Sequence, residues 1–234
     1  FYEMFYEDAE VASRVLGLTL TARNNGGAAE VPLAGVPVKA VSEYLRRLVR
    51  HGFRVAICEQ VEDPKTAKGV VQREVVRVIT PGTITDGEAL DARDNNFLAA
   101  VSQGKRNFGL AVTDVTTGEF RFTQMPDDAA LMDELGRIRP SEIVLKEDDR
   151  SLKEQIERGL PGVHLSLVSP LYFFHSAQDK LKSLNLWSRE TDEEWEEGIR
   201  AASVIVSSRR QFARSAEGLK ESPTLLERSI PHAR

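Results

Sequence analysis

The chain has 234 residues, of which 41% are hydrophobic and 29% charged, and its formal net charge is −5. This composition is typical of a folded globular protein and excludes a disordered or collagen-like chain. Because there is one Cys, an internal disulfide framework is excluded. No apolar run approaches the roughly 18 residues that a membrane span needs. We therefore expect a cytoplasmic protein that does not insert into a membrane.

The acidic excess is unevenly distributed along the chain. Residues 23–77 carry ten Lys and Arg against six Asp and Glu, whereas the blocks on either side are acidic. The overall charge excludes a uniformly basic nucleic-acid binder, but a polyanion could dock on this stretch. The alternative, which composition alone favours, is a solvated surface of mixed sign.

Helices and strands alternate in the first part of the chain. Apolar spacing and Gly or Pro punctuation predict a helix at 4–16, a strand at 18–21, a stiff turn at 32–37, a helix at 40–51 and strands at 53–61 and 74–80. Gly17 is placed to end the first helix, and Arg46, Arg47 and Arg50 lie on the polar face of the second.

An acidic, polar stretch then separates two predicted domains, at 1–84 and 97–234, with a linker at 85–96. The second domain is predicted to have strands at 97–101, 109–115, 120–123 and 142–145 and helices at 127–138, 151–158, 176–184 and 192–220. This order indicates an α/β fold. With no initiator Met and no signal-peptide pattern, we expect a piece of a longer protein.

The usual signatures of a stand-alone enzyme are absent. The chain has neither G-x-x-x-x-G-K-[ST] nor G-x-G-x-x-G, and its four His residues have no metal-ligand spacing. Cys58 lies within an apolar run and is interpreted as a buried hydrophobic residue rather than a reactive thiol. We therefore predict no catalytic residues, metal site or cofactor in this chain.

Asp114 is the one catalytic alternative. It ends a predicted strand, with Glu119 beyond the next turn, as in metal-dependent nucleases of the RNase H type. Such enzymes need several convergent carboxylates, and no clear second and third acid follow. The favoured interpretation is that the Asp114 side chain caps the turn at Thr116–Gly118.

Several blocks, taken in order, resemble one family. They are Phe1-Tyr2-Glu3, Leu18–Thr21, Pro32–Pro37, Val55–Pro64 and Arg73–Thr83, followed by Asp94–Ala100, Phe108–Phe120 and Arg139–Leu145. Together they resemble bacterial MutS proteins, which recognise DNA mismatches. The resemblance implies a mixed-sheet α/β mismatch-recognition domain followed by an RNase H-like α/β connector domain that is not a nuclease. It thins beyond about residue 185, although Ala201–Val206 resembles the last connector helix.

The resemblance assigns the mismatch contact to Phe1 and Glu3. The family's Phe wedges beside a mispaired base, and its Glu hydrogen-bonds that base. A wedge that unstacks a base step reads how easily DNA deforms rather than its sequence, so one ring can serve many mismatches. The alternative for Phe1 is a core anchor at the end of a strand.

Other implied DNA contacts lie in the basic stretch. Arg23 and Arg73 match DNA-contacting arginines of the family, and Arg77 is a further candidate. Leu33, in the turn at 32–37, is expected near the minor-groove backbone, and the alternative is a structural turn that packs Leu33 into the core.

The connector is implied to link DNA recognition to ATPase and clamp parts outside this chain. ATP and Mg²⁺ would belong to the full-length protein, whose partners would be mismatched double-stranded DNA, a second MutS subunit and a MutL-type protein. Two other hypotheses remain open: a nuclease centred on Asp114, and a protein-interaction module of a MutS relative without mismatch activity.

Overall fold

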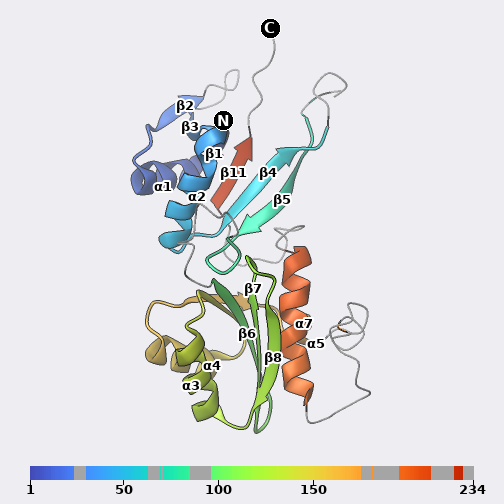
Figure 1. The fold of residues 1–234 in the computed structure, drawn as a ribbon. Coiled ribbons are helices and arrows are strands. Elements are labelled where there is room, and N and C mark those ends of the chain that lie inside the picture. Colours follow the sequence, from blue (N-terminus) through green and yellow to red (C-terminus); the bar gives the residue numbers. More distant parts are fainter. Residues whose placement is uncertain are drawn as a thin grey trace. The chain divides into compact units, whose positions relative to one another are not determined.

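The computed structural model describes residues 1–23, 30–62, 69, 71–84, 96–174, 181, 195–211 and 224–228. The chain divides into two compact units (Figure 1). The first comprises Phe1–Thr80 together with a strand at Thr224–Arg228, and the second comprises Pro81–Gln211. Each unit is built around one mixed sheet, so the predicted two-domain α/β class is confirmed.

The first unit contains a six-stranded sheet in the order β2-β3-β1-β11-β4-β5. Its strands are β1 (Tyr2–Phe5), β2 (Thr21–Arg23), β3 (Val31–Val36), β4 (Val55–Gln60), β5 (Arg73–Ile79) and β11 (Thr224–Arg228). Its helices are α1 (Tyr6–Leu16), α2 (Val41–Arg50) and the single 3-10 turn η1 (Val38–Ala40). Among the described strands of this sheet, only β11 and β4 pair in parallel.

The helix predicted at 4–16 begins later, because its first residues form the end of β1. Met4 and Phe5 pair with Ala34 and Leu33 of β3, and the helix begins at Tyr6. Tertiary pairing therefore overrides the local apolar periodicity at these positions. The predicted end is confirmed, since Gly17 adopts a left-handed conformation with φ 71°.

The turn predicted at 32–37 is also wrong, because Val31–Val36 form strand β3 between β1 and β2. Pro32 lies opposite Ala22, and alternate residues Ala34 and Val36 are fully buried. Proline removes one backbone donor from a strand, but it leaves the extended conformation available. The strand predicted at 18–21 is displaced to Thr21–Arg23.

The second unit contains a five-stranded sheet in the order β10-β9-β6-β7-β8. Its strands are β6 (Phe97–Gln103), β7 (Phe108–Asp114), β8 (Phe120–Met125), β9 (Glu142–Lys146) and β10 (His164–Val168). Its helices are α3 (Asp128–Ile138), α4 (Arg150–Gly159), α5 (Leu171–Phe174) and α7 (Glu196–Gln211). The first three strands form an antiparallel meander, and β9 and β10 follow in parallel, which is the RNase H-like order.

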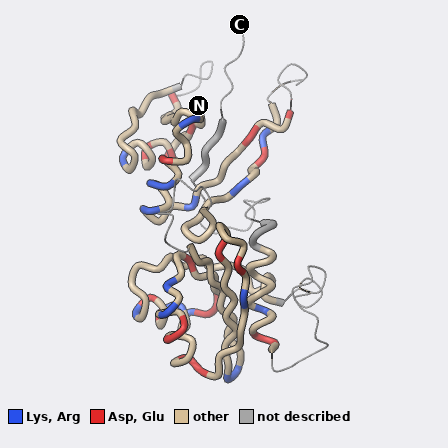
Figure 2. Tube along the Cα trace, viewed as in Figure 1, with Lys and Arg blue, Asp and Glu red and all other residues tan. Residues whose placement is uncertain are grey.

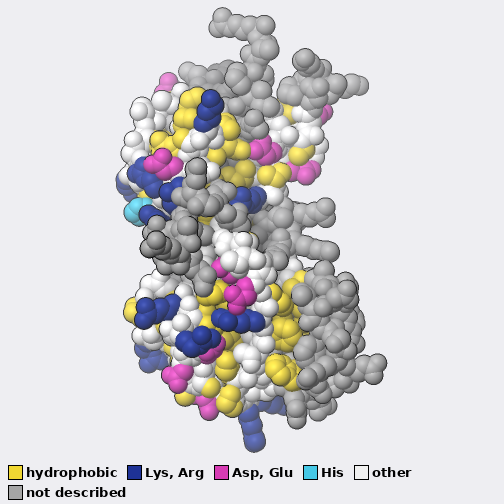
Figure 3. Space-filling view, in the orientation of Figure 1, with side chains coloured by type: hydrophobic (Ala, Val, Ile, Leu, Met, Phe, Trp, Pro, Cys, Tyr) yellow, Lys and Arg dark blue, Asp and Glu magenta, His cyan; other side chains and the backbone are white. Residues whose placement is uncertain are grey.

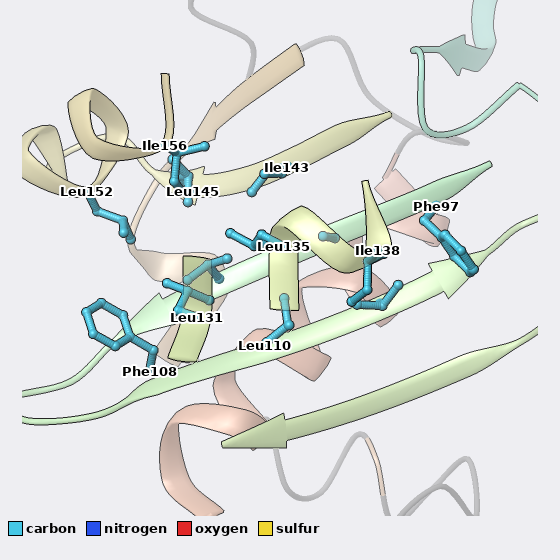
Figure 4. Close-up of a cluster of buried hydrophobic side chains, with 13 residues drawn as sticks. Phe97, Phe108, Leu110, Leu131, Leu135, Ile138, Ile143, Leu145, Leu152 and Ile156 are labelled. Atoms are coloured by element: carbon cyan, nitrogen blue, oxygen red, sulfur yellow. The ribbon is translucent and has the colours of Figure 1, made fainter. Parts of the chain in front are cut away.

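Helices cover both faces of this second sheet. On one face, α3 and α4 enclose a core that includes Leu110, Leu135 and Ile143 (Figure 4). On the other face, α5 and α7 pack over alternate strand residues such as Leu98 and Ala111. Every residue of β7 is buried as a result. Strands covered on both sides read as continuous apolar runs, which is why the sequence predicted them well.

The domain boundaries differ from the prediction in two places. The passage between the units falls at Thr80–Pro81 rather than in the stretch 85–96. Gly82 belongs to the second unit because its N–H donates to Glu142 at 2.9 Å, and a Cβ on Gly82 would lie 2.9 Å from that residue's Cβ. The predicted domain at 97–234 is also interrupted, because β11 pairs with β1 and β4. Residues 85–95 lie outside the described part.

Candidate nucleic-acid interface

Strand β1 directs its residues alternately to the two faces of the first sheet. Tyr2 and Met4 are buried, whereas Glu3 and Phe5 are partly exposed and Phe1 is 60% exposed. Helix α1 packs against β1 and β3, and its small residues Ala9 and Ala12 allow close contact. Since successive strand residues point in opposite directions, Phe1 and Glu3 belong to the face opposite Tyr2. We call this side the open face.

Gly35 lies beside Phe1 and Glu3 on this open face. It is paired with Glu3 across β1 and β3. A Cβ on Gly35 would lie 3.6 Å from Cδ1 of Phe1 and 3.8 Å from Cγ of Glu3, so both side chains extend over this glycine. Leu33, two residues away, is partly exposed on the same face. The predicted residues Phe1, Glu3 and Leu33 are therefore brought together on adjacent strands.

The register of β4 and β5 assigns the two predicted arginines to different faces. The hydroxyl of Tyr2 donates to Oε1 of Glu59, so Glu59 shares the covered face with Tyr2 and its neighbour Gln60 faces the open side. Gln60 is paired with Arg73, which places Arg73 on the open face. An irregularity between Ile57 and Cys58 changes the alternation, and Arg77, opposite Ile57, falls on the covered side.

Strand β11 gives an independent check of this assignment. Its register aligns Glu3 with Cys58 through Glu227, so Glu3 and Cys58 share the open side.

Basic and acidic positions alternate along the β4–β5 hairpin (Figure 2). The visible face of the first unit carries hydrophobic side chains beside Lys and Arg (Figure 3).

Arg73 and Gln60 each carry an unsatisfied polar atom. Nε of Arg73 and Oε1 of Gln60 are buried and make no hydrogen bond in the described part of the chain. An unpaired buried donor or acceptor costs free energy, so such atoms are uncommon unless a ligand or water completes them. Gln60 was not among the sequence-predicted contacts, because its face can be inferred only after the pairing with β5 is known.

For Arg23 the structure describes only the backbone. It is the last residue of β2 and is paired with Val31 of β3. Counting from Thr21, which is paired with Leu33, its position alternates onto the open face. The loop predicted at 24–27 lies outside the described residues.

A second copy of the Phe-Tyr-Glu triplet, at residues 5–7, does not repeat the geometry of the first. Phe5 is extended, with φ −125° and ψ 161°, but Tyr6 begins helix α1 with φ 53°. The period of two that aligns Phe1 with Glu3 ends where the strand ends. Only the first triplet therefore presents an aromatic ring and a carboxylate on one sheet face.

Asp114 is used locally, as the favoured interpretation predicted. Its carboxylate is fully buried, and Oδ1 accepts from the Thr116 N–H at 2.8 Å and from the Thr116 hydroxyl at 2.6 Å. Burial raises the pKa of Asp114, but hydrogen bonds from Thr116, Thr117 and Asn96 together lower it below its ordinary value. Among the described residues, no group of three or more His, Cys, Asp or Glu could hold a metal ion.

A cavity of about 840 Å³ lies in the second unit, between the β6–β7 hairpin and the start of α7. Two of its charged pairs are close: Arg200 contacts Glu197 at 2.7 Å, and Lys146 lies 3.6 Å from Asp149. Burial raises the pKa of Asp149, and Lys146 opposes that effect. Both pairs join residues three positions apart, whereas the hydroxyl of Ser102 on β6 donates to Glu197 and links α7 to the sheet.

Comparison with known proteins identifies a family and several relatives. The family model of MutS domain I matches residues 1–88, and that of MutS domain II matches residues 96–207. The DNA mismatch repair protein MutS of Pelotomaculum thermopropionicum is 51% identical over 148 residues, covering 62% of this chain and 17% of the relative. The MutS of Syntrophomonas wolfei is 40% identical over 216 residues, covering 88% of this chain and 25% of the relative.

The fold and the matches define a two-domain module in which MutS domain I is followed by MutS domain II. The chain belongs to the MutS family. It spans between 17% and 25% of the length of these curated relatives. No described helix is both long and apolar enough to span a bilayer.

Proposed function

We propose that the first unit binds mismatched double-stranded DNA through the open face of its sheet. The observation that carries this proposal is the 60% exposure of Phe1 beside Glu3, on a strand whose alternate residues are buried. An exposed aromatic ring beside a carboxylate on one sheet face is available to stack on a ligand and to orient it by a hydrogen bond. Insertion of the ring into the minor groove unstacks a base step, and this costs least where a base is mispaired.

Glu3 supplies the polar part of the contact. Residues two apart on a strand are separated by about 7 Å, so the carboxylate of Glu3 is within reach of the same mispaired base beside which Phe1 wedges. The carboxylate also repels the phosphates of stiff, paired DNA, which disfavours the abundant competitor. Arg73 and Arg23 would contact phosphates, and Leu33 would lie against the groove backbone above Gly35.

The second unit is proposed to act as a connector rather than as an enzyme. Its sheet is covered on both faces, and the carboxylate of Asp114 is engaged in a turn, so the nuclease hypothesis gains no support. The module would relay DNA binding to ATPase and clamp parts of a full-length protein. The same proposal assigns ATP and Mg²⁺ to those parts, and a second MutS subunit and a MutL-type protein to its partners.

The test is a comparison of matched and mismatched duplexes with the full-length protein that contains this segment, at fixed salt concentration. Phe1→Ala should weaken mismatch binding about 5- to 100-fold, since base–aromatic stacking contributes roughly 1–3 kcal/mol. Phe1→Leu should lose most of the same affinity, because it keeps the apolar surface but removes the stacking ring. Leu171→Ala, which removes a 62% exposed side chain from the second unit, is the matched control.

Glu3→Gln tests the polar contact separately. We expect affinity for mismatched DNA to be retained and affinity for matched DNA to rise, so the ratio of the two falls. Unchanged mismatch binding by Phe1→Ala would reject the wedge, and an unchanged ratio for Glu3→Gln would reject only the role of the carboxylate.

A further inference from the structure

We propose that Tyr2 is a positioning residue that holds Phe1 and Glu3 in a fixed orientation relative to Arg73 on β5. This inference rests on the proposed function. Tyr2 stands between the two residues in sequence, but its ring lies on the covered face and is 8% exposed. Its hydroxyl donates to Oε1 of Glu59 at 2.5 Å, a contact between residues 57 positions apart.

The hydrogen bond joins two halves of the first sheet. Tyr2 is on β1, Glu59 is on β4, and β11 lies between them. Adjacent strands are about 4.8 Å apart, so the two backbones are separated by about 10 Å. The side-chain bond therefore links the half that carries Phe1 and Glu3 to the half that carries Arg73.

The orientation of Tyr2 fixes the orientation of its neighbours. Successive strand residues project to opposite faces, so a rotation of the backbone at Tyr2 would turn Phe1 and Glu3 together. The ring has few rotatable bonds, and a hydrogen bond to a carboxylate is shorter and stronger than one between neutral groups. A wedge must keep its geometry within about 0.5 Å to unstack a base rather than fold back on the sheet.

The consequence is a selective effect on mismatched DNA. Binding to a matched duplex depends on phosphate contacts, which do not require the ring to be inserted. Binding to a mismatch also requires Phe1 and Glu3 to be held ready for insertion. Loss of the tether should therefore reduce the affinity ratio between mismatched and matched DNA rather than both affinities equally.

The decisive variant is Tyr2→Phe in the full-length protein, which removes one oxygen atom and keeps the buried ring. We expect the affinity ratio to fall about three- to tenfold, the range for loss of one hydrogen bond, with matched-duplex affinity unchanged. Glu59→Ala should give the same loss, and the double variant should add nothing further, because the two residues form one interaction. Glu59→Gln keeps an acceptor oxygen and should retain most of the ratio.

Tyr44→Phe is the matched control. Tyr44 lies on α2, and the guanidinium carbon of Arg47 is 5.9 Å from the centre of its ring, away from the Tyr2 contact. Removal of the Tyr44 hydroxyl should leave the ratio of mismatched to matched affinity unchanged. If Tyr2→Phe is too unstable to purify, Glu59→Ala against Glu59→Gln gives the same comparison.

The outcomes separate this inference from the proposed function. An unchanged ratio for Tyr2→Phe or Glu59→Ala, alongside a loss for Phe1→Ala, would overturn the positioning role and leave the wedge intact. Equal weakening on both duplexes would also overturn it, since that is the result of a merely structural role. If Phe1→Ala itself has no effect, the wedge is rejected whatever Tyr2→Phe does.

Discussion

The two sheets of this chain differ in how many of their faces are covered. In the second unit, helices pack on both faces and every residue of β7 is buried. In the first unit, β1 alternates between buried and partly exposed residues, and no residue of β5 from Arg73 to Arg77 is fully buried. Covering both faces gives a rigid support, whereas leaving one face uncovered keeps a surface available for a ligand.

Buried polar groups can be compared between the two units in the same way. In the second unit, the buried carboxylate of Glu142 accepts from Gly82 and from Ser166, and Gln124 accepts from the first N–H groups of α7. On the open face of the first sheet, buried polar atoms of Gln60 and Arg73 remain unpaired. Among the described residues, buried polar atoms without a hydrogen bond also occur in the second unit, at Asp114, Asp149 and His164, so what distinguishes Gln60 and Arg73 is their position on the open face.

The largest expected effect tests whether the second sheet is the support. Leu135 is fully buried between α3 and the sheet, so Leu135→Ala should destabilise the second unit by about 2–5 kcal/mol. Phe1→Ala should change stability by less than about 0.5 kcal/mol, because the ring is largely exposed. Urea unfolding monitored by circular dichroism measures both. A large loss of unfolding free energy for Phe1→Ala would place the ring in the core and contradict the assignment of an open face.

The next prediction compares one glycine from each sheet. A Cβ on Gly109 would lie 1.9 Å from the carbonyl oxygen of Glu197, so Gly109→Ala must displace the start of α7, at a cost of about 3 kcal/mol. A Cβ on Gly35 would make only ordinary contacts, the nearest at 3.5 Å, so Gly35→Ala should be nearly neutral for stability. Similar unfolding midpoints for the two variants would contradict the assignment of covered and open faces.

A smaller effect tests the turn at Asp114. Asp114→Ala removes the acceptor for Thr116 and should cost about 1 kcal/mol at pH 7. Because the folded pKa of Asp114 lies below its ordinary value of 3.8, its stabilising contribution is present above that pH and is lost as pH falls through the folded value. The difference between variant and parent should therefore shrink in acid. A difference that grows below pH 3.8 would be inconsistent with this sign.

The smallest expected effect distinguishes the two arginines of β5. Arg73→Ala should weaken binding to matched and mismatched duplexes alike, and should reduce the salt dependence by about one phosphate contact. Arg77→Ala serves as its matched comparison, because the register places Arg77 on the covered side. Fluorescence anisotropy at several salt concentrations gives both slopes. The reverse order of the two slopes would show that the β5 register does not determine the contact.

The sequence predicts the covered sheet better than the open one. The strands at β6, β7 and β9 read as apolar runs, and Asp127 caps α3 close to its predicted start. Strand β3 was missed because Pro32 and Gly35 are usual turn residues, and β10 was missed because its mixed pattern His164–Val168 is partly exposed. Whether β3 and β10 form strands depends on pairing with other strands, which the local sequence does not show.

For the candidate site, residue types were predictable but their faces were not. Phe1 and Glu3 follow from a motif, and its period of two already implies a shared face if the segment is a strand. The division between Arg73 and Arg77 depends on an irregularity opposite Ile57, which leaves no local signal in the sequence. Gln60 and Glu59 gain roles only through their partners on other strands.

The amide of Asn96 donates to the carbonyl oxygens of Pro81 and Ile84, at 3.0 and 3.4 Å. Residues 84 and 96, on either side of the stretch outside the described part, are therefore held close together by this one side chain. Loop closure becomes more costly only slowly with length, by about 0.6 kcal/mol for each doubling. An insertion between residues 84 and 96 should therefore leave both sheets intact, which a fluorescent tag placed there would test.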